Sequence, residues 1–127
     1  MKDKDIDKAF GEWATKDSGE RIDYASGMRR DINDGKPRFD LLTPYGIPFE
    51  DQMLTRWAAL MARGAKKYGA RNWECANSIE EYQRFQDSAF RHFIQWLTGE
   101  EDEDHAAAVL FNVAAAEALW WRLMNDE

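Results

Sequence analysis

Apolar residues at helical spacing dominate the second half of the chain and predict three helices. They recur every three or four positions over residues 50–68, again over 78–97, and a third time over 102–124. Ser78 and Glu81 have the spacing of a capping box, which places the start of the second helix. No segment shows sustained alternation of apolar and polar residues, so we expect no β-sheet. Helices of this length joined by short loops predict an all-α fold, a small helical bundle.

The first half of the chain predicts an arm followed by an ordered loop. Residues 1–25 are polar, apart from a short amphipathic stretch over residues 6–14 that has the pattern of a peripheral helix. Residues 27–50 contain three prolines and several glycines, which exclude a long helix or a central strand. They also carry apolar and basic residues, a combination typical of a functional loop. We therefore expect an N-terminal arm over residues 1–25 and one all-α domain over residues 26–127.

The third helix is the most apolar element and bears on membranes and on partners. Its apolar run over residues 106–121 is interrupted by Asn112 and Glu117 and is too short to cross a bilayer, which predicts a buried helix. Its many alanines allow close approach of a neighbouring helix. Leu119, Trp120 and Trp121 extend beyond what one small bundle covers, so we expect a homo-oligomer, a dimer or tetramer, formed through helices.

Charge and cysteine usage restrict the partners further. The chain has 24 acidic and 17 basic residues and a formal net charge of −7, which argues against binding a nucleic-acid polymer. The single cysteine, Cys75, fits a reducing cytoplasm, and the charged start has no secretory signal. We expect a cytoplasmic protein without a membrane partner. An acidic protein binds phosphates through divalent cations when its carboxylates hold the ions.

The strongest candidate for such a site is Glu103-Asp104-His105, followed by Asn112. His105 and Asn112 are seven positions apart, so on a helix they project within about 20° of each other. Oxygen ligands suit Mg²⁺ or Mn²⁺, and an imidazole favours Mn²⁺. Acidic residues at a helix start also simply complement the helix dipole. That alternative leaves Asn112 unexplained, because a polar side chain in a buried apolar helix needs a partner.

A second candidate is His92 on the second helix, with Asp87 and Arg91 nearby. The chain has only two histidines, and they lie on consecutive helices that we expect to be antiparallel, each close to an acidic residue. Asp87 and Arg91 also have the spacing of an ordinary ion pair within a helix. A lone histidine on a helix is more often structural than a metal ligand, so both interpretations of His92 stay open.

A third candidate is a set of basic and aromatic residues in two glycine-bearing loops. Gly35-Lys36 is not a P-loop, because the upstream glycine and the following Ser or Thr are missing. In an acidic protein, clustered Lys and Arg side chains are candidates for binding a triphosphate, and an aromatic ring can stack on a base. With Arg91 of the second helix, the candidate substrate-binding residues are Arg30, Lys36, Arg38, Lys67, Tyr68, Arg71, Asn72, Trp73 and Arg91.

Several of these stretches, in this order, resemble a phage family named for dATP/dGTP diphosphohydrolase activity, related by name to the MazG-like pyrophosphohydrolases. The resemblance covers about residues 26–117 and implies an all-α fold, Mg²⁺ or Mn²⁺ dependence, deoxynucleoside triphosphate substrates and a role in trimming the host nucleotide pool. The matching pieces are Ser26-Gly27, Arg30-Asp31, Gly35-Lys36-Pro37-Arg38-Phe39-Asp40-Leu41-Leu42, Gly64-Ala65-Lys66-Lys67-Tyr68-Gly69, Arg71-Asn72-Trp73, Asp87-Ser88-Ala89, Arg91-His92, Glu103-Asp104-His105 and Phe111-Asn112.

The chain departs from the MazG-like pattern in its acidic motifs. Such enzymes usually carry an ExxE pair on one helix and an ExxD pair on the next. Here Glu80 and Glu81 lack a partner at ExxE spacing, so other residues would have to bind the metal. We expect Glu103, Asp104 and His92 to act in catalysis, and the metal ligands to come from Asp87, His92, Glu103, Asp104, His105 and Asn112.

We therefore expect a phage-encoded enzyme of the host cytoplasm that hydrolyses (deoxy)nucleoside triphosphates, with purine dNTPs as the favoured substrates, to monophosphate and pyrophosphate. A water activated by the bound ion would be the nucleophile. The alternative is a non-catalytic protein that sequesters a nucleotide, including a signalling nucleotide of host defence. A structural or interaction module is the third hypothesis, and it predicts no rise in melting temperature with nucleotide.

Overall fold

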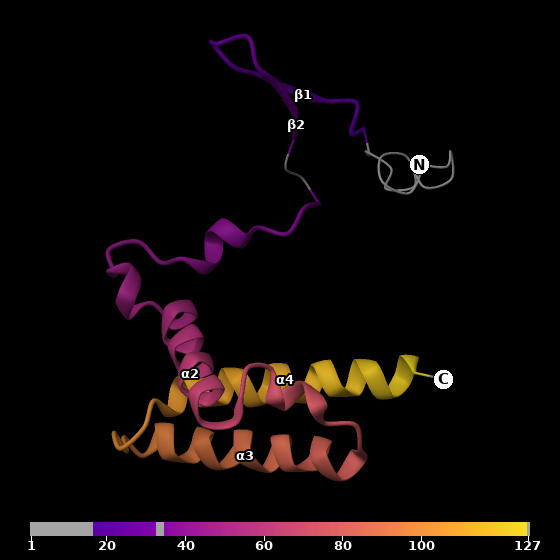
Figure 1. Ribbon diagram of the computed structural model, residues 1–127. Helices are drawn as coiled ribbons and strands as arrows, with labels where there is room; N and C mark the ends of the chain where they lie inside the picture. Colours follow the sequence, from indigo (N-terminus) through magenta and orange to yellow (C-terminus); the bar gives the residue numbers. More distant parts are fainter. Residues whose placement is uncertain (1–16, 33–34, 127) are drawn as a thin grey trace. The chain divides into compact units, whose positions relative to one another are not determined.

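The computed structural model describes residues 17–32 and 35–126, and the helix expected over residues 6–14 lies outside them. The chain divides into two compact units, Met1–Arg38 and Phe39–Glu127. The N-terminal unit carries a β-hairpin and the second unit carries the helices (Figure 1). We describe each unit by itself. The protein is thus mostly helical with one small sheet.

The hairpin corrects the expectation that the chain has no β-sheet. Strands β1 (Arg21–Asp23) and β2 (Arg29–Asp31) pair antiparallel. The Tyr24 N–H donates to the Met28 carbonyl over 2.9 Å, and Gly27 takes the positive φ of 93° that the turn requires. Strands of three residues are too short to show the alternation by which strands are found in a sequence.

The three predicted helices are confirmed, with small shifts at their starts. Their bounds are α2 (Met53–Tyr68), α3 (Ile79–Leu97) and α4 (His105–Asn125). Short 3₁₀ turns lie before and between them: η2 (Phe39–Leu42), η3 (Phe49–Asp51) and η4 (Asn72–Cys75). The first helix begins later than residue 50 because η3 takes up the three residues after Pro48.

Side-chain caps determine where α3 and α4 begin. The Ser78 hydroxyl accepts a hydrogen bond from the Glu81 N–H over 3.2 Å, and the Glu81 carboxylate accepts from the Asn77 N–H over 3.1 Å. This confirms the predicted capping box. Asp104 caps α4 by accepting from the Ala107 N–H over 3.1 Å, so α4 begins at the next residue rather than in the acidic run before it.

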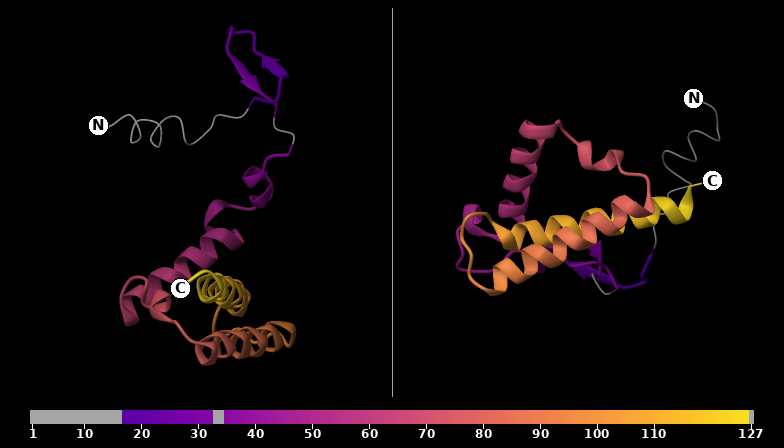
Figure 2. Two further views of the ribbon diagram at one scale, coloured as in Figure 1. Left: turned by 90° about the vertical axis from the view of Figure 1, so that its right-hand side faces the viewer. Right: turned by 90° about the horizontal axis from the view of Figure 1, so that it is seen from below.

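The helices α3 and α4 run side by side as an antiparallel pair, and α2 crosses over them in contact with α4 (Figures 1 and 2). Close packing follows from the small side chains of α4. Its buried apolar residues are Ala107, Ala108, Ala115, Ala116 and Leu119. The burial of Leu119 corrects the expectation that it extends beyond the bundle, whereas Trp120 and Trp121 are exposed. Aromatic rings cover the end of the pair, where Tyr82 and Trp120 lie with ring centroids 5.2 Å apart.

On sequence alone, a membrane span is excluded because the apolar run over residues 106–121 is too short. The helix α4 is longer than that run, so its length does not exclude a membrane span. The helix has 21 residues and a mean hydropathy of 1.2, and it is the one helix in the described ranges with such length and composition. It buries two polar side chains, His105 and Asn112, against its neighbours in the bundle. These contacts pack α4 against α2 and α3 within the bundle.

Candidate functional site

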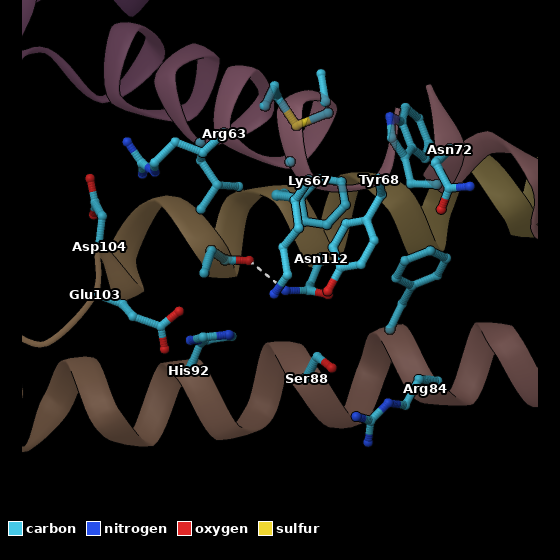
Figure 3. A pocket seen from close by; sticks show the side chains of 18 of the residues that line it. Arg63, Lys67, Tyr68, Asn72, Arg84, Ser88, His92, Glu103, Asp104 and Asn112 are labelled. Atoms are coloured by element: carbon cyan, nitrogen blue, oxygen red, sulfur yellow. Dashed lines mark hydrogen bonds between the residues drawn. The ribbon is translucent and has the colours of Figure 1, made fainter. Parts of the chain in front are cut away.

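A cavity of 1070 Å³ lies among α2, η4, α3 and α4, at the upper end of the range for small-molecule sites (Figure 3). Arg63 and Lys67 reach into it from α2, while Arg84, Ser88 and His92 come from α3. The histidine and acidic residues gather at one end, and Tyr68, Asn72 and Arg84 lie toward the other (Figure 3). The cavity therefore joins acidic, basic and aromatic side chains in one hollow.

Most of the residues selected from the sequence line this cavity. They are Lys67, Tyr68, Arg71, Asn72, Trp73, His92, Glu103, Asp104 and Asn112. Asp87 and Arg91 are exposed on α3 and are not among the lining residues. Arg30, Lys36 and Arg38 belong to the N-terminal unit, so their part in the site stays a prediction.

The two histidines of the chain meet at the acidic end of the cavity. His92 and His105 are 8% and 2% exposed, and their Nδ1 atoms are 2.9 Å apart. Potential ligand atoms of His92, His105 and the exposed Glu103 all lie within 4.8 Å of one another. The set combines two imidazoles with one carboxylate, which is a donor set that binds divalent metal ions in proteins.

Asp102 accepts a hydrogen bond from the His105 ring on the solvent side. Its Oδ1 is 2.7 Å from His105 Nε2, and the hydrogen bond from the imidazole holds the pKa of the Asp102 carboxyl below its ordinary value. A carboxylate only accepts, so Nε2 of His105 carries the proton. Burial, with the nearby charge of Arg91, lowers the pKa of His92, which favours a neutral imidazole.

Asp104 is engaged in two structural interactions. Its carboxylate accepts two hydrogen bonds from Arg56, over 2.8 and 2.6 Å, in addition to capping α4. The Arg56 guanidinium lowers the pKa of the Asp104 carboxyl. The fork-shaped pairing ties α2 to the start of α4 and so fixes one wall of the cavity. The predicted metal-binding and catalytic roles of Asp104 would have to be compatible with this pair.

Asn112 finds its partner within its own helix. Its amide nitrogen donates to the Ala108 carbonyl over 2.8 Å, and the residue is 7% exposed while lining the cavity. The described residues provide no hydrogen bond to its carbonyl oxygen. The carbonyl oxygen of Asn112 is therefore a hydrogen-bond acceptor in the cavity wall, available to a ligand or to a group that contacts the histidines.

The predicted substrate-binding residues that line the cavity differ in their contacts with other side chains. The Lys67 ammonium lies 4.9 Å from the centre of the Tyr68 ring, and the Tyr68 hydroxyl raises the pKa of Lys67. Arg71 pairs with Glu74 over 2.5 Å. Trp73 packs edge-on against Phe111 at a centroid distance of 6.0 Å. Each of the three thus already contacts another side chain: Lys67 contacts Tyr68, Arg71 pairs with Glu74, and Trp73 packs on Phe111.

The lining residues that the sequence did not predict include four polar side chains: Arg63, Arg84, Ser88 and Asp102. A signal existed for three of them. Arg84, Ser88 and His92 are spaced by four on α3, and Arg63 precedes Lys67 by four on α2, so each lies on the face of a residue that had been selected. The link from Asp102 to the His105 ring depends on the path of the loop before α4.

The fold and the site define a small helical protein with a polar pocket and a histidine–carboxylate cluster. The chain belongs to the family described as dATP/dGTP diphosphohydrolase, N-terminal, whose model matches residues 26–127. The resemblance seen in the sequence is thereby confirmed. No curated protein and no solved structure matches the chain.

Proposed function

We propose that this protein binds a nucleoside triphosphate, a purine dNTP by preference, and hydrolyses it to monophosphate and pyrophosphate with a divalent ion, Mg²⁺ or Mn²⁺. The observation that carries the proposal is the cavity in which Arg63 and Lys67 of α2 lie across from His92 and Glu103, while Arg84 of α3 lines the other end (Figure 3). The name of the family supports the reaction and the purine preference.

Nucleotide binding would depend on the positive charge that lines the cavity of an otherwise acidic protein. The chain carries a net charge of −7, yet Arg63, Lys67 and Arg84 project into one hollow. Guanidinium groups bind phosphate oxygens through paired hydrogen bonds, and an ammonium group adds a compact positive charge. Tyr68 and Trp73 line the same hollow and offer ring faces to the base. The loop residues Arg30, Lys36 and Arg38 would add further phosphate contacts.

Glu103 is the best candidate for the general base. Its carboxylate is exposed beside His92, and no hydrogen bond to it is made by any described residue. His92, His105 and Glu103 would hold a divalent ion at this end, which would supply Lewis-acid activation of a water. Glu103 would take the proton of that water, whose oxygen bonds to the α-phosphorus as the bond to the bridging oxygen breaks. Lys67 would offset the charge that develops on the departing pyrophosphate.

The deciding experiment is incubation of the purified protein with each dNTP and NTP plus Mn²⁺ or Mg²⁺, with chromatography of the products. We expect monophosphate and pyrophosphate from a subset of substrates, and loss of both with EDTA. Unchanged nucleotide in every incubation would contradict the proposal. Release of phosphate and a diphosphate would also contradict it, because attack would then fall on a different phosphorus.

A specific observation keeps sequestration as a second candidate. Of the four consecutive acidic residues that line the cavity, Asp102 and Asp104 are already engaged with His105 and Arg56. A site with so few free carboxylates suits binding without turnover, including binding of a host-defence signalling nucleotide. Native mass spectrometry after incubation separates the two candidates: retained, unmodified nucleotide supports sequestration, and repeated turnover supports the enzyme.

A further inference from the structure

The paired histidines at the acidic end of the cavity carry an inference about which ion the protein takes. Both rings are nearly inaccessible to water, and each comes from a different helix: His92 from the middle of α3 and His105 from the first position of α4. Glu103 completes a group of three potential ligand atoms within 4.8 Å. Two imidazoles that face each other in a buried position beside the alanines of α4 need a chemical explanation.

The distance between the two Nδ1 atoms fits a shared ion. Two nitrogens bound to one ion at about 2.1 Å, at a right angle, lie about 3.0 Å apart. The observed separation of His92 Nδ1 and His105 Nδ1 is 2.9 Å. A direct N–H···N hydrogen bond would have a similar length. The hydrogen bond requires a proton on Nδ1 of His92, whereas the shared ion requires that Nδ1 carry none. The two interpretations can therefore be distinguished by measuring metal binding.

Asp102 prepares His105 for metal binding. Because Asp102 Oδ1 accepts from Nε2 over 2.7 Å, the neutral His105 ring has its lone pair on Nδ1, the atom that faces His92. A carboxylate that fixes the tautomer of a histidine in this way is a recurring feature of metal centres. Asp102 is thus a positioning residue, acting through His105 rather than on the substrate.

We propose that His92 Nδ1, His105 Nδ1 and one Glu103 carboxylate oxygen form a three-ligand site for one divalent transition-metal ion, Mn²⁺ in preference to Mg²⁺, with the second Glu103 oxygen left to act as the proposed base. Nitrogen donors favour first-row transition metals, whereas Mg²⁺ takes oxygen ligands and keeps its waters. Three protein ligands leave positions for phosphate oxygens and a water, so the inference deepens the proposed function and rests on it for the role of the ion.

The test measures metal binding without nucleotide. The purified chain is freed of metal with a chelator and titrated by calorimetry with MnCl₂ and with MgCl₂, and Co²⁺ is added as a probe with visible absorption. We expect one Mn²⁺ per chain, bound at least tenfold more tightly than Mg²⁺, and a Co²⁺ spectrum of a nitrogen-containing site. Equal affinity for Mg²⁺ and Mn²⁺, or no saturable binding, would overturn the proposal.

Variants assign the ligands. Glu103→Gln should lose most Mn²⁺ affinity while its circular dichroism stays that of the parent, because Glu103 is exposed. The matched control is Glu100→Gln, an exposed acidic residue of the same loop outside the cluster, which should keep full affinity. Equal affinity of the two variants would exclude Glu103 as a ligand.

The role of Asp102 is read by nitrogen NMR of the imidazoles. In the parent protein His105 should show a protonated Nε2 and a bare Nδ1, and Asp102→Asn should disturb that tautomer and weaken Mn²⁺ binding about 10–100-fold. An unchanged tautomer and affinity would contradict the positioning role. Hydrolysis that persists with Mg²⁺ while Mn²⁺ binding fails would refute this inference alone; Mn²⁺ binding without hydrolysis would refute only the proposed reaction.

Discussion

At the scale of single residues, three neighbouring acidic side chains have three different surroundings. Asp102 holds the His105 ring, Asp104 pairs with Arg56 and caps α4, and Glu103 faces the cavity without a hydrogen-bond partner in the described part of the chain. These surroundings assign different consequences to substitutions that look alike in the sequence.

Glu103→Gln should reduce kcat by at least about 100-fold with little change in stability, because a general base typically contributes that much and the side chain is exposed. Steady-state hydrolysis of the preferred dNTP measures kcat, and thermal melting measures stability. Glu100→Gln, with the same change in charge, should retain parental kcat. A Glu103→Gln protein with parental kcat would remove Glu103 from the mechanism.

Asp104→Ala should lower the free energy of unfolding by about 1–2 kcal/mol, because it removes a helix cap and the partner of Arg56. Urea denaturation gives this value. The sequence-based hypothesis adds that turnover is abolished, and activity measured well below the unfolding midpoint separates the two effects. Full activity together with parental stability would contradict both the structural and the catalytic assignment.

Lys67→Met should raise KM for the triphosphate roughly 10–100-fold, because a charge-assisted contact to phosphate is lost over the cavity. Lys66→Met is the control, since Lys66 is exposed on α2 and does not line the cavity. Initial rates across a range of substrate concentrations measure KM for each protein. Equal KM for the two variants would place the phosphates elsewhere.

At the scale of elements, local hydrogen bonds set the helix starts and hold the walls of the site in place. The capping box of α3 joins Ser78 to Glu81, and α3 in turn carries Arg84, Ser88 and His92 on one face toward the cavity. The start of α4 is tied to α2 by the pair of Arg56 and Asp104. Stability of these ends should therefore affect the geometry of the site.

Ser78→Ala should destabilise the protein by about 1 kcal/mol, because the N–H groups of the first turn of α3 lose their acceptor. The melting temperature should fall by a few degrees. Ser78→Asp restores a capping oxygen and should recover most of the loss. If Ser78→Ala melts at the parental temperature, the capping box seen in the structure has no energetic role in solution.

At the scale of the whole molecule, the helical unit exposes much apolar surface. Its buried apolar side chains, within the described ranges, are five alanines and one leucine, and no large side chain is fully buried. On the outer face of α3, Phe90, Phe93 and Leu97 recur at spacings of three and four and are exposed. So continuous a stripe on so small a core supports the proposal, first drawn from the sequence, that the chain is a homo-oligomer.

We therefore expect the melting temperature to rise with protein concentration, because association stabilises only the folded chain. Light scattering coupled to gel filtration should give a dimer or tetramer, and Phe90→Glu should shift it toward the monomer. Glu80→Gln, an exposed change on a different face of the same helix, should leave the assembly intact. A monomer at all concentrations, with a constant melting temperature, would refute the proposal.

The sequence by itself determined the three helices, the capping box of α3 and nine of the residues that line the cavity. Helical periodicity and capping depend on residues three or four positions apart, so the information lies within a short segment, as with Ser78 and Glu81. The β-hairpin escaped detection because strands of three residues carry no measurable alternation.

Only the tertiary structure decided how the candidate residues are divided among roles. The contact of His92 with His105 spans 13 positions, and that of Arg56 with Asp104 spans 48. Such contacts depend on how α2 crosses the α3–α4 pair, which the alanines of α4 allow but do not specify. A run of acidic residues before a helix is consistent with capping, ion pairing or metal binding. Packing places Asp104 against Arg56, Asp102 against His105, and Glu103 at the open side of the cavity, because each carboxylate lies next to a different neighbour.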